Sequence, residues 1–296
     1  MTDDPVKLAI LTGVVGATTK ELLSGAVDLT KMWLSDYFQR HHKKALETVD
    51  NRAWKFIALL SRRVDRLEST NAYRDETIER LEHALDSPEF SVSLQSAVIS
   101  SSLTDDEVKH ELLARAVADR LVAREESLVA LTVAIAIQTI PHLSPNHLRL
   151  LGLAALVEGI RPSNAAIPTD ESARSTYLRE WWTREVGYHH PPPIVLPQDY
   201  RHLAAMRCVA REPSTRVDHL SFLLAETGMR PIDWGAKDFL SNTVEGAALA
   251  NLWETGLRDH RLLSIGTVLG IYAHDLRTGS DTDMSFWGSS PWGVKQ

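Results

Sequence analysis

The chain has 296 residues, 44% hydrophobic and 24% charged, which excludes a disordered protein and favours one large globular domain or two smaller ones. The formal net charge of −7 gives no overall attraction for nucleic acid or an anionic membrane. Cys208 is the only cysteine, which excludes an intrachain disulfide and a zinc site built from several cysteines. Together with an acidic start, unlike a basic secretory signal, this predicts a cytoplasmic protein.

The first predicted element is an amphipathic segment over residues 6–35, inside an N-terminal helical segment that we place at 1–50. Its uncharged run, 8–19, is well short of the roughly 20 residues that cross a bilayer. It is either a core or oligomerisation helix, or a segment that contacts a membrane once released. The apolar residues of this membrane or oligomer segment are Leu8, Ile10, Leu11, Val14, Val15, Leu22 and Leu23.

A basic stretch follows over residues 40–66, with Trp54 and Phe56 interleaved among the cations. Such a pattern occurs on surfaces that bind nucleic acid or an acidic partner. However, the cations lie opposite an apolar stripe of the same helix, as a solvated helix face requires. We favour the solvated face and keep a candidate interaction surface of Arg52, Lys55, Arg62, Arg63 and Arg66.

Apolar residues alternating three and four apart form a heptad seam over residues 57–85. Asn71 and Arg74 fall within this seam. They are either a polar layer in one long helix or the sign of two helices broken near 69–72. We favour a long coiled-coil-like or bundle helix, paired within or between chains.

Capping signals predict the next helices. Ser87-Pro88 provides an N-cap and a proline at the first helical position. Thr104 and Glu107 match a capping box in front of an amphipathic helix. The same signal explains the sequence Asp106-Glu107-Val108-Lys109, which otherwise resembles the acidic-x-Lys element of metal-dependent nucleases.

A helix over about 126–140 is apolar nearly all round, which predicts a place at the centre of the core. Pro141 ends it, and Ser144-Pro145 begins a leucine-rich helix that ends near Gly159. The connection is short, so the two helices should return antiparallel. Residues 104–160 therefore predict a central capped hairpin.

The remaining chain predicts helices at 169–186, 197–211, 216–227, 242–258 and 262–276, with a proline-rich linker at 188–193 and a coil tail holding at most a short strand. The predicted fold is an all-α, multi-helix bundle with a smaller, mostly helical C-terminal subdomain. Its bundle core spans 51–187 and its subdomain 194–296.

The histidine pairs at 41–42 and 189–190 are the obvious metal candidates, but neighbouring side chains on a helix point about 100° apart and cannot chelate together. Asp199 and His202 could complete a set with the second pair, although an exposed loop is the simpler interpretation. Cys208 is expected to be buried packing, and Gly266 with Gly270 should allow two helices to approach closely. No catalytic or metal residue is assigned and no cofactor is expected.

The caps, turns and packing residues resemble an uncharacterised bacterial helical family whose customary label is a pair of locus tags beginning LPO and Vpar. The capped hairpin is also similar, more weakly, to the abortive-infection alpha family. Both resemblances imply a bacterial antiphage or conflict system, and neither supplies catalytic residues. The segments that carry the first resemblance are 85–90, 103–107, 112–114, 134–136, 140–148, 263–274 and 283–287.

We therefore expect a non-enzymatic helical protein of an antiphage or abortive-infection type system, acting through protein–protein contacts and self-association. Its partner would be a second copy, another protein of the same system, or both. Nucleic acid is not favoured, and a membrane is reached only through the N-terminal segment. Two alternatives remain: a membrane-perturbing toxic effector that uses residues 6–35, and a metal-dependent nuclease or hydrolase around residues 189–202.

Overall fold

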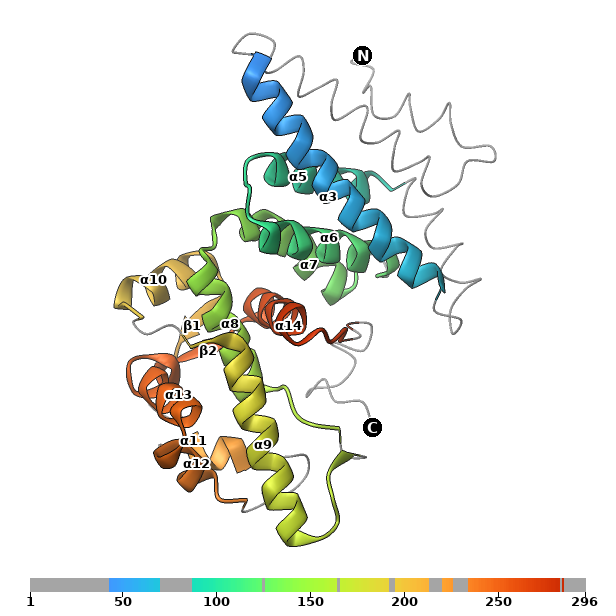
Figure 1. The fold of residues 1–296 in the computed structure, drawn as a ribbon. Helices are drawn as coiled ribbons and strands as arrows, with labels where there is room; N and C mark the ends of the chain where they lie inside the picture. The colour runs from blue at the N-terminus through green and yellow to red at the C-terminus, as the bar shows by residue number, and fades with distance from the viewer. Residues whose placement is uncertain are drawn as a thin grey trace. The chain divides into compact units, whose positions relative to one another are not determined.

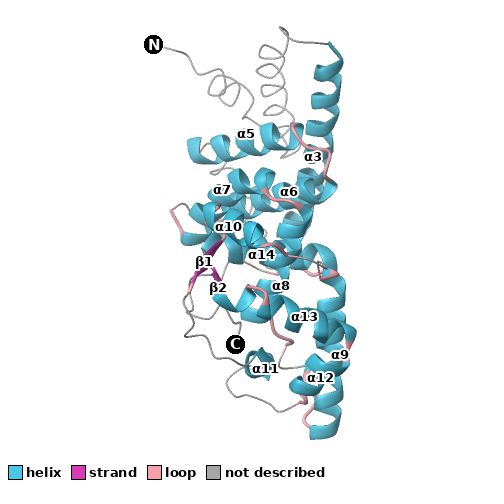
Figure 2. Ribbon diagram, turned by 90° about the vertical axis from the view of Figure 1, so that its left-hand side faces the viewer, coloured by secondary structure: helices cyan, strands magenta, loops and turns pink. Residues whose placement is uncertain are grey.

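The computed structural model describes residues 43–69, 87–123, 126–163, 166–191, 195–212, 220–225, 234–282 and 284. These ranges are helical nearly throughout, with two short strands, which confirms the all-α prediction (Figure 2). They divide into unit 1, ending at His142, and unit 2, beginning at Leu143. The predicted domain limits at 50, 187 and 194 stay predictions.

Several sequence-based predictions lie outside the described residues: the amphipathic segment 6–35, the histidine pair at 41–42, and the seam positions Asn71 and Arg74. Among the helices that are described, none has the length and hydrophobicity needed to cross a bilayer.

In the described part of unit 1, α3 lies across α5 and α6 (Figure 1). The buried side of α3 carries Phe56, Leu60 and Val64, as its apolar stripe predicts. The elements of this unit are α3 (Lys43–Ser69), α5 (Pro88–Ser102), α6 (Glu107–Val122), α7 (Leu128–Thr139) and the 3₁₀ turn η1 (Ile140–His142).

The centre of unit 1 is α6, because it packs against α3, α5 and α7. Its alanines, Ala114, Ala116 and Ala118, are fully buried, and their small side chains let three helices approach a single one. Leu112 and Leu113 fill the remaining space around it.

The prediction that the helix at 126–140 lies at the centre is wrong. One side of α7, with Val133 and Ile137, is buried, whereas Leu128, Leu131 and Ile135 are about half exposed. Hydrophobicity all round a helix indicates burial only if enough neighbours are available, and among the described elements α7 makes its main contacts with α5, α6 and η1.

Helix starts in unit 1 follow the predicted caps with one correction. The Ser87 hydroxyl accepts from the Phe90 amide, as predicted. Thr104 is not the N-cap of α6, however, because the Asp106 carboxylate accepts from the Val108 amide and takes that position. The Thr104 hydroxyl instead accepts from the Asp106 amide, so it supports the turn that precedes the cap.

Unit 2 is organised around α8, whose leucines Leu148, Leu151 and Leu156 are fully buried. It packs most extensively against α14 and also contacts α9 and β2 (Figure 1). The elements are α8 (Pro145–Glu158), α9 (Glu171–His189), α10 (Pro197–Ala205), β1 (Val209–Arg211), α11 (Leu220–Ala225), α12 (Ala236–Asn242), α13 (Val244–Glu254), η3 (Leu257–Asp259), β2 (His260–Leu262) and α14 (Ser264–Thr278).

Close packing in this unit depends on glycine: Gly270 lies against helix α8, as predicted, whereas Gly266 lies against the turn at Cys208 and not against a helix. A Cβ atom on Gly270 would lie 2.5 Å from the Leu151 carbonyl oxygen of α8, and one on Gly266 would lie 1.9 Å from the Cys208 carbonyl oxygen. Gly152 makes room for the His189 ring, because a Cβ atom added at Gly152 would lie 2.4 Å from His189 Cε1. Any side chain at these positions would push the elements apart.

The predicted hairpin is correct in its turn and in the Ser144 cap, but not in its packing. Ser144 and His147 form a capping box at the start of α8, directly after the proline-containing turn. Yet the unit boundary falls in this turn, so that α7 packs in unit 1 and α8 in unit 2. The hairpin is therefore a connection between two cores and not the centre of one.

Two predicted helices also end differently. The helix predicted over 197–211 stops at Ala205, and its last three residues form β1, which pairs antiparallel with β2 in the register Val209↔Leu262. In the opposite direction, α9 continues past Val186 to His189, and His190 ends it with a left-handed backbone (φ 43°). The residues predicted to start an extended linker thus belong to a helix.

Candidate functional site

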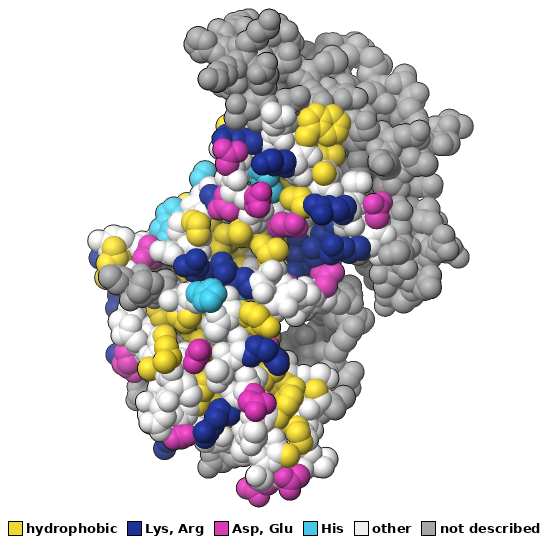
Figure 3. Space-filling model, in the orientation of Figure 1, with side chains coloured by type: hydrophobic (Ala, Val, Ile, Leu, Met, Phe, Trp, Pro, Cys, Tyr) yellow, Lys and Arg dark blue, Asp and Glu magenta, His cyan; other side chains and the backbone are white. Residues whose placement is uncertain are grey.

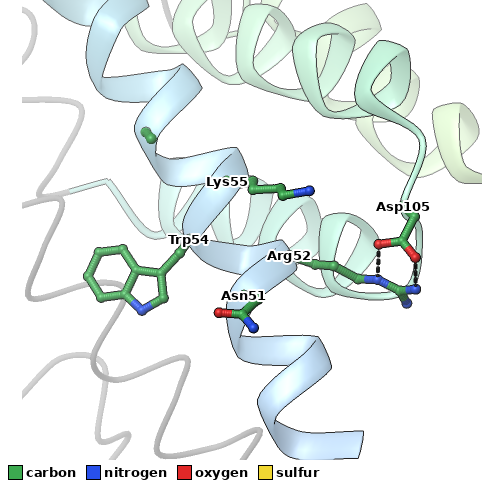
Figure 4. Close-up of a pocket in the computed structure, with 6 residues that line it drawn as sticks. Asn51, Arg52, Trp54, Lys55 and Asp105 are labelled. Atoms are coloured by element: carbon green, nitrogen blue, oxygen red, sulfur yellow. Dashed lines mark hydrogen bonds and ion pairs between the residues drawn. The ribbon is translucent and has the colours of Figure 1, made fainter.

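The outward side of α3 carries the predicted interaction residues. Arg52 binds the Asp105 carboxylate through two nitrogens, and its Nε lies 2.5 Å from Asp105 Oδ1 (Figure 4). The same guanidinium faces the Ser102 carbonyl at the end of α5, with 3.5 Å between Nη1 and the oxygen. This bidentate pair joins α3 to the α5–α6 connection and holds the pKa of Asp105 below its usual range.

An open depression of about 580 Å³ lies beside this pair. Figure 4 shows Trp54 on one side of α3, the Arg52–Asp105 pair on the other, and Lys55 and Asn51 between them. Ala58 contributes the smallest side chain of the lining. The depression combines an aromatic ring, a cation and an amide, which suits binding of a polar or acidic group.

The other predicted cations are arranged as a solvated helix face. Lys55, Arg62 and Arg66 are exposed and Arg63 is half-buried. Figure 3 shows Lys and Arg side chains gathered over α3. Phe56, by contrast, is fully buried and cannot take part in a basic–aromatic surface. We define the α3 surface as Asn51, Trp54, Lys55, Ala58 and Arg62 with the Arg52–Asp105 pair.

A second open surface lies on α7. Leu128, Leu131 and Ile135 are 52%, 56% and 45% exposed, and their spacing of three and four residues places them on one side of the helix. No residue of α7 is charged. We call these three residues the α7 face.

Unit 2 contains a buried chain of ionisable side chains that the sequence analysis missed in part. His189 Nε2 lies 3.0 Å from His274 Nδ1, and His274 Nε2 lies 3.6 Å from a Glu185 carboxylate oxygen. All three residues are at most 6% exposed. Because a carboxylate favours a proton on the nearer nitrogen, His274 carries its proton on Nε2 and accepts the His189 N–H at Nδ1.

This arrangement leaves His189 Nδ1 buried with no hydrogen-bond partner. Burial, more than the neighbouring charges, lowers the pKa of His189 to about 3, and burial also lowers the pKa of His274. Both imidazoles are therefore neutral at physiological pH. The prediction of an exposed loop is wrong for His189, although His190 is exposed.

Asp199 and His202 do not join the 189–190 pair. Instead, His147 Nε2 lies 3.2 Å from Asp199 Oδ1, and the His147 and His202 rings stack with centroids 4.8 Å apart. His147 Nδ1 accepts from the Ser144 amide and Asp199 Oδ2 accepts from the Leu196 amide. These contacts link α8 to α10. This structural role accounts for His147, Asp199 and His202 without a metal ion.

Over the described ranges, no three or more His, Cys, Asp or Glu side chains are arranged to hold a metal ion. Asp106 is occupied as an N-cap, and Lys109 donates to the Pro141 carbonyl (3.0 Å). The Cys208 thiol is fully buried, which raises its pKa to about 12. Its burial is as predicted, although it lies in a turn before β1 and not in a helix.

The model of an uncharacterised family with a locus-tag name matches residues 22–217, about two thirds of the chain. No curated protein and no solved structure matches the sequence.

Proposed function

Starting from the chain's membership of this uncharacterised family, we propose that it is a non-enzymatic protein that acts by self-association and protein–protein contacts. The setting we propose is a bacterial antiphage or abortive-infection type system, as expected from the sequence.

The α7 face is the observation that carries the proposal. Three large apolar side chains lie exposed on a helix without charges, and covering them lowers the free energy because apolar surface is removed from water. A second copy is the occupant we propose, because an uncharged apolar helix is complementary to itself. Antiparallel pairing would bury the α7 face of each copy without desolvating any charge of α7.

Light scattering coupled to size-exclusion chromatography tests self-association. The wild-type chain should have a multiple of its 33.0 kDa mass at micromolar concentration. Leu131→Arg should reduce the mass to that of a monomer, because it places a charge in the centre of the α7 face. Val244→Arg is the matched control, since Val244 is an 83% exposed apolar residue of unit 2.

A wild-type chain that stays at 33.0 kDa at every concentration would remove the basis of the proposal. Equal masses for the Leu131 and Val244 variants would instead show that association does not use the α7 face. A phage plating assay with the same two variants tests the defence setting, in which only Leu131→Arg should lose protection.

The two alternatives have no comparable support. The membrane effector depends on residues 6–35, which lie outside the described residues; liposome leakage that survives deletion of this segment would argue against it. The metal-dependent nuclease or hydrolase would need a ligand set that the described part of unit 2 does not bring together.

A further inference from the structure

The α3 surface differs from the α7 face in its chemistry. Lys55 and Arg62 are both exposed and lie seven residues apart on one helix. Seven residues are two turns, so the two side chains leave the helix on the same side about 10.5 Å apart. Ala58 lies between them at the open depression, and Trp54, 41% exposed, lies beside it.

The neighbouring charges indicate what such a surface can bind. The Arg52 guanidinium is occupied by Asp105, whose own side chain is 70% exposed. Asp65 is exposed on the same helix. A continuous polyanion such as nucleic acid would meet these two carboxylates as well as the cations, on a chain whose net charge is −7.

A helix with separate carboxylates avoids this repulsion. Acidic residues seven apart on a docked helix have the same spacing as Lys55 and Arg62. An apolar side chain midway between those acidic residues would reach the depression over Ala58, where a small residue allows close approach.

We propose that the α3 surface binds an acidic amphipathic helix of a protein partner, with carboxylates seven residues apart contacting Lys55 and Arg62. This inference rests on the proposed interaction role but uses a different surface from the α7 face. Charge complementarity fixes the position of the docked helix along α3, and the apolar residue adds contact with Trp54.

A fluorescein-labelled helical peptide with two glutamates seven apart and a leucine midway tests the proposal, with fluorescence anisotropy as the readout and the full-length protein as the receptor. A permuted peptide has the same composition with the glutamates on opposite sides of the helix. Lys55→Glu and Arg62→Glu should each weaken binding of the first peptide by about tenfold or more. Lys237→Glu and Arg201→Glu, at exposed positions of unit 2, should change it by less than about twofold.

The permuted peptide should bind at least about fivefold more weakly, and added salt should weaken binding of the first peptide. Equal binding of the two peptides, or no loss in Lys55→Glu, would overturn the proposal. Tighter binding of a single-stranded oligonucleotide with the same sensitivity to Lys55 and Arg62 would show a nucleic-acid surface instead. Lys55→Gln, which removes the positive charge without introducing a negative one, provides a second variant if Lys55→Glu unfolds.

Light scattering on the same variants separates this inference from the proposed self-association. Lys55→Glu should retain the oligomeric mass and lose the peptide, whereas Leu131→Arg should do the reverse. Loss of both properties in Lys55→Glu would contradict the assignment of separate surfaces.

Discussion

At the scale of residues, the Glu185–His274–His189 chain shows how a folded core restricts ionisation. A protonated His189 would place a charge between α8, α9 and α14, where its Nδ1 faces Gly152 and has no partner. The nearby groups include Asp275 and Arg277 as well as Glu185, but burial is the largest influence on both histidines. The fold therefore requires neutral imidazoles at this position.

This requirement predicts a loss of stability in acid. In the unfolded chain a histidine takes up a proton below about pH 6.5, whereas folded His189 does so only near pH 3. Its contribution is complete above pH 6.5 and is lost as the pH falls towards 3. At pH 5 the loss from His189 alone is about 2 kcal/mol. Urea unfolding, followed by tryptophan fluorescence, should show this slope between pH 6.5 and 5.

His189→Gln should reduce the pH slope, while His190→Asn should leave it unchanged, because His190 is exposed and asparagine tolerates its left-handed backbone. A wild-type unfolding free energy that is constant over this pH range would contradict the assignment of two buried neutral histidines.

The sequence could indicate these residues only partly. His189 is visible as a metal candidate, but its partners Glu185 and His274 are one helical turn and 85 residues away. Glycine provides the only local signal: Gly152 and Gly270 mark places where something must approach α8 and α14 closely. Which side chain fills such a place depends on tertiary packing, which a single sequence does not define.

At the scale of elements, helix starts are the most predictable feature. Ser87 and Ser144 are N-caps as expected, because a hydroxyl that satisfies a free amide acts through neighbours in the chain. The prediction of Thr104 as the N-cap of α6 is wrong because Thr104 and Asp106 both offer an acceptor within three residues. The Asp106 carboxylate takes the N-cap position. Local chemistry therefore predicts that a helix starts, but not always at which residue.

The Ser144 cap gives a direct test at this scale. Ser144→Ala should destabilise unit 2 by about 1 kcal/mol, because it leaves the His147 amide at the start of α8 without its acceptor. Ser241→Ala, at an exposed hydroxyl that bonds only to a carbonyl of its own helix, should stay within about 0.5 kcal/mol. Urea unfolding at pH 7 measures both; equal changes would show that the capping box contributes little.

Whether a helix is central or peripheral is much less predictable. The uniformly apolar helix α7 is expected at the centre from its sequence but is open on one side, and the amphipathic helix α6 is surrounded instead. Arg115 and Arg120 of α6 are buried despite their charge, so polarity along α6 underestimates its burial. The number of neighbours around a helix is a property of the assembled unit.

At the scale of the whole molecule, helical content and family are both recovered from sequence, whereas the division at residues 142 and 143 is not. The turn there has the composition of a hairpin loop, and nothing local distinguishes a return within one core from a passage between two. Within the described part of unit 1, α7 packs mainly against α5, α6 and η1, which leaves the α7 face without a neighbour in that group.

The most direct test of the account is oxidation of a single cysteine placed in the α7 face. Cys208 is fully buried, so it provides an unreactive background in which only an introduced thiol forms disulfides between copies. Leu131→Cys lies near the middle of the face, and Val244→Cys is the exposed control in unit 2. We predict that mild oxidation converts Leu131→Cys to a covalent dimer much faster than Val244→Cys. Equal, slow dimer formation by the two variants would contradict self-association through α7.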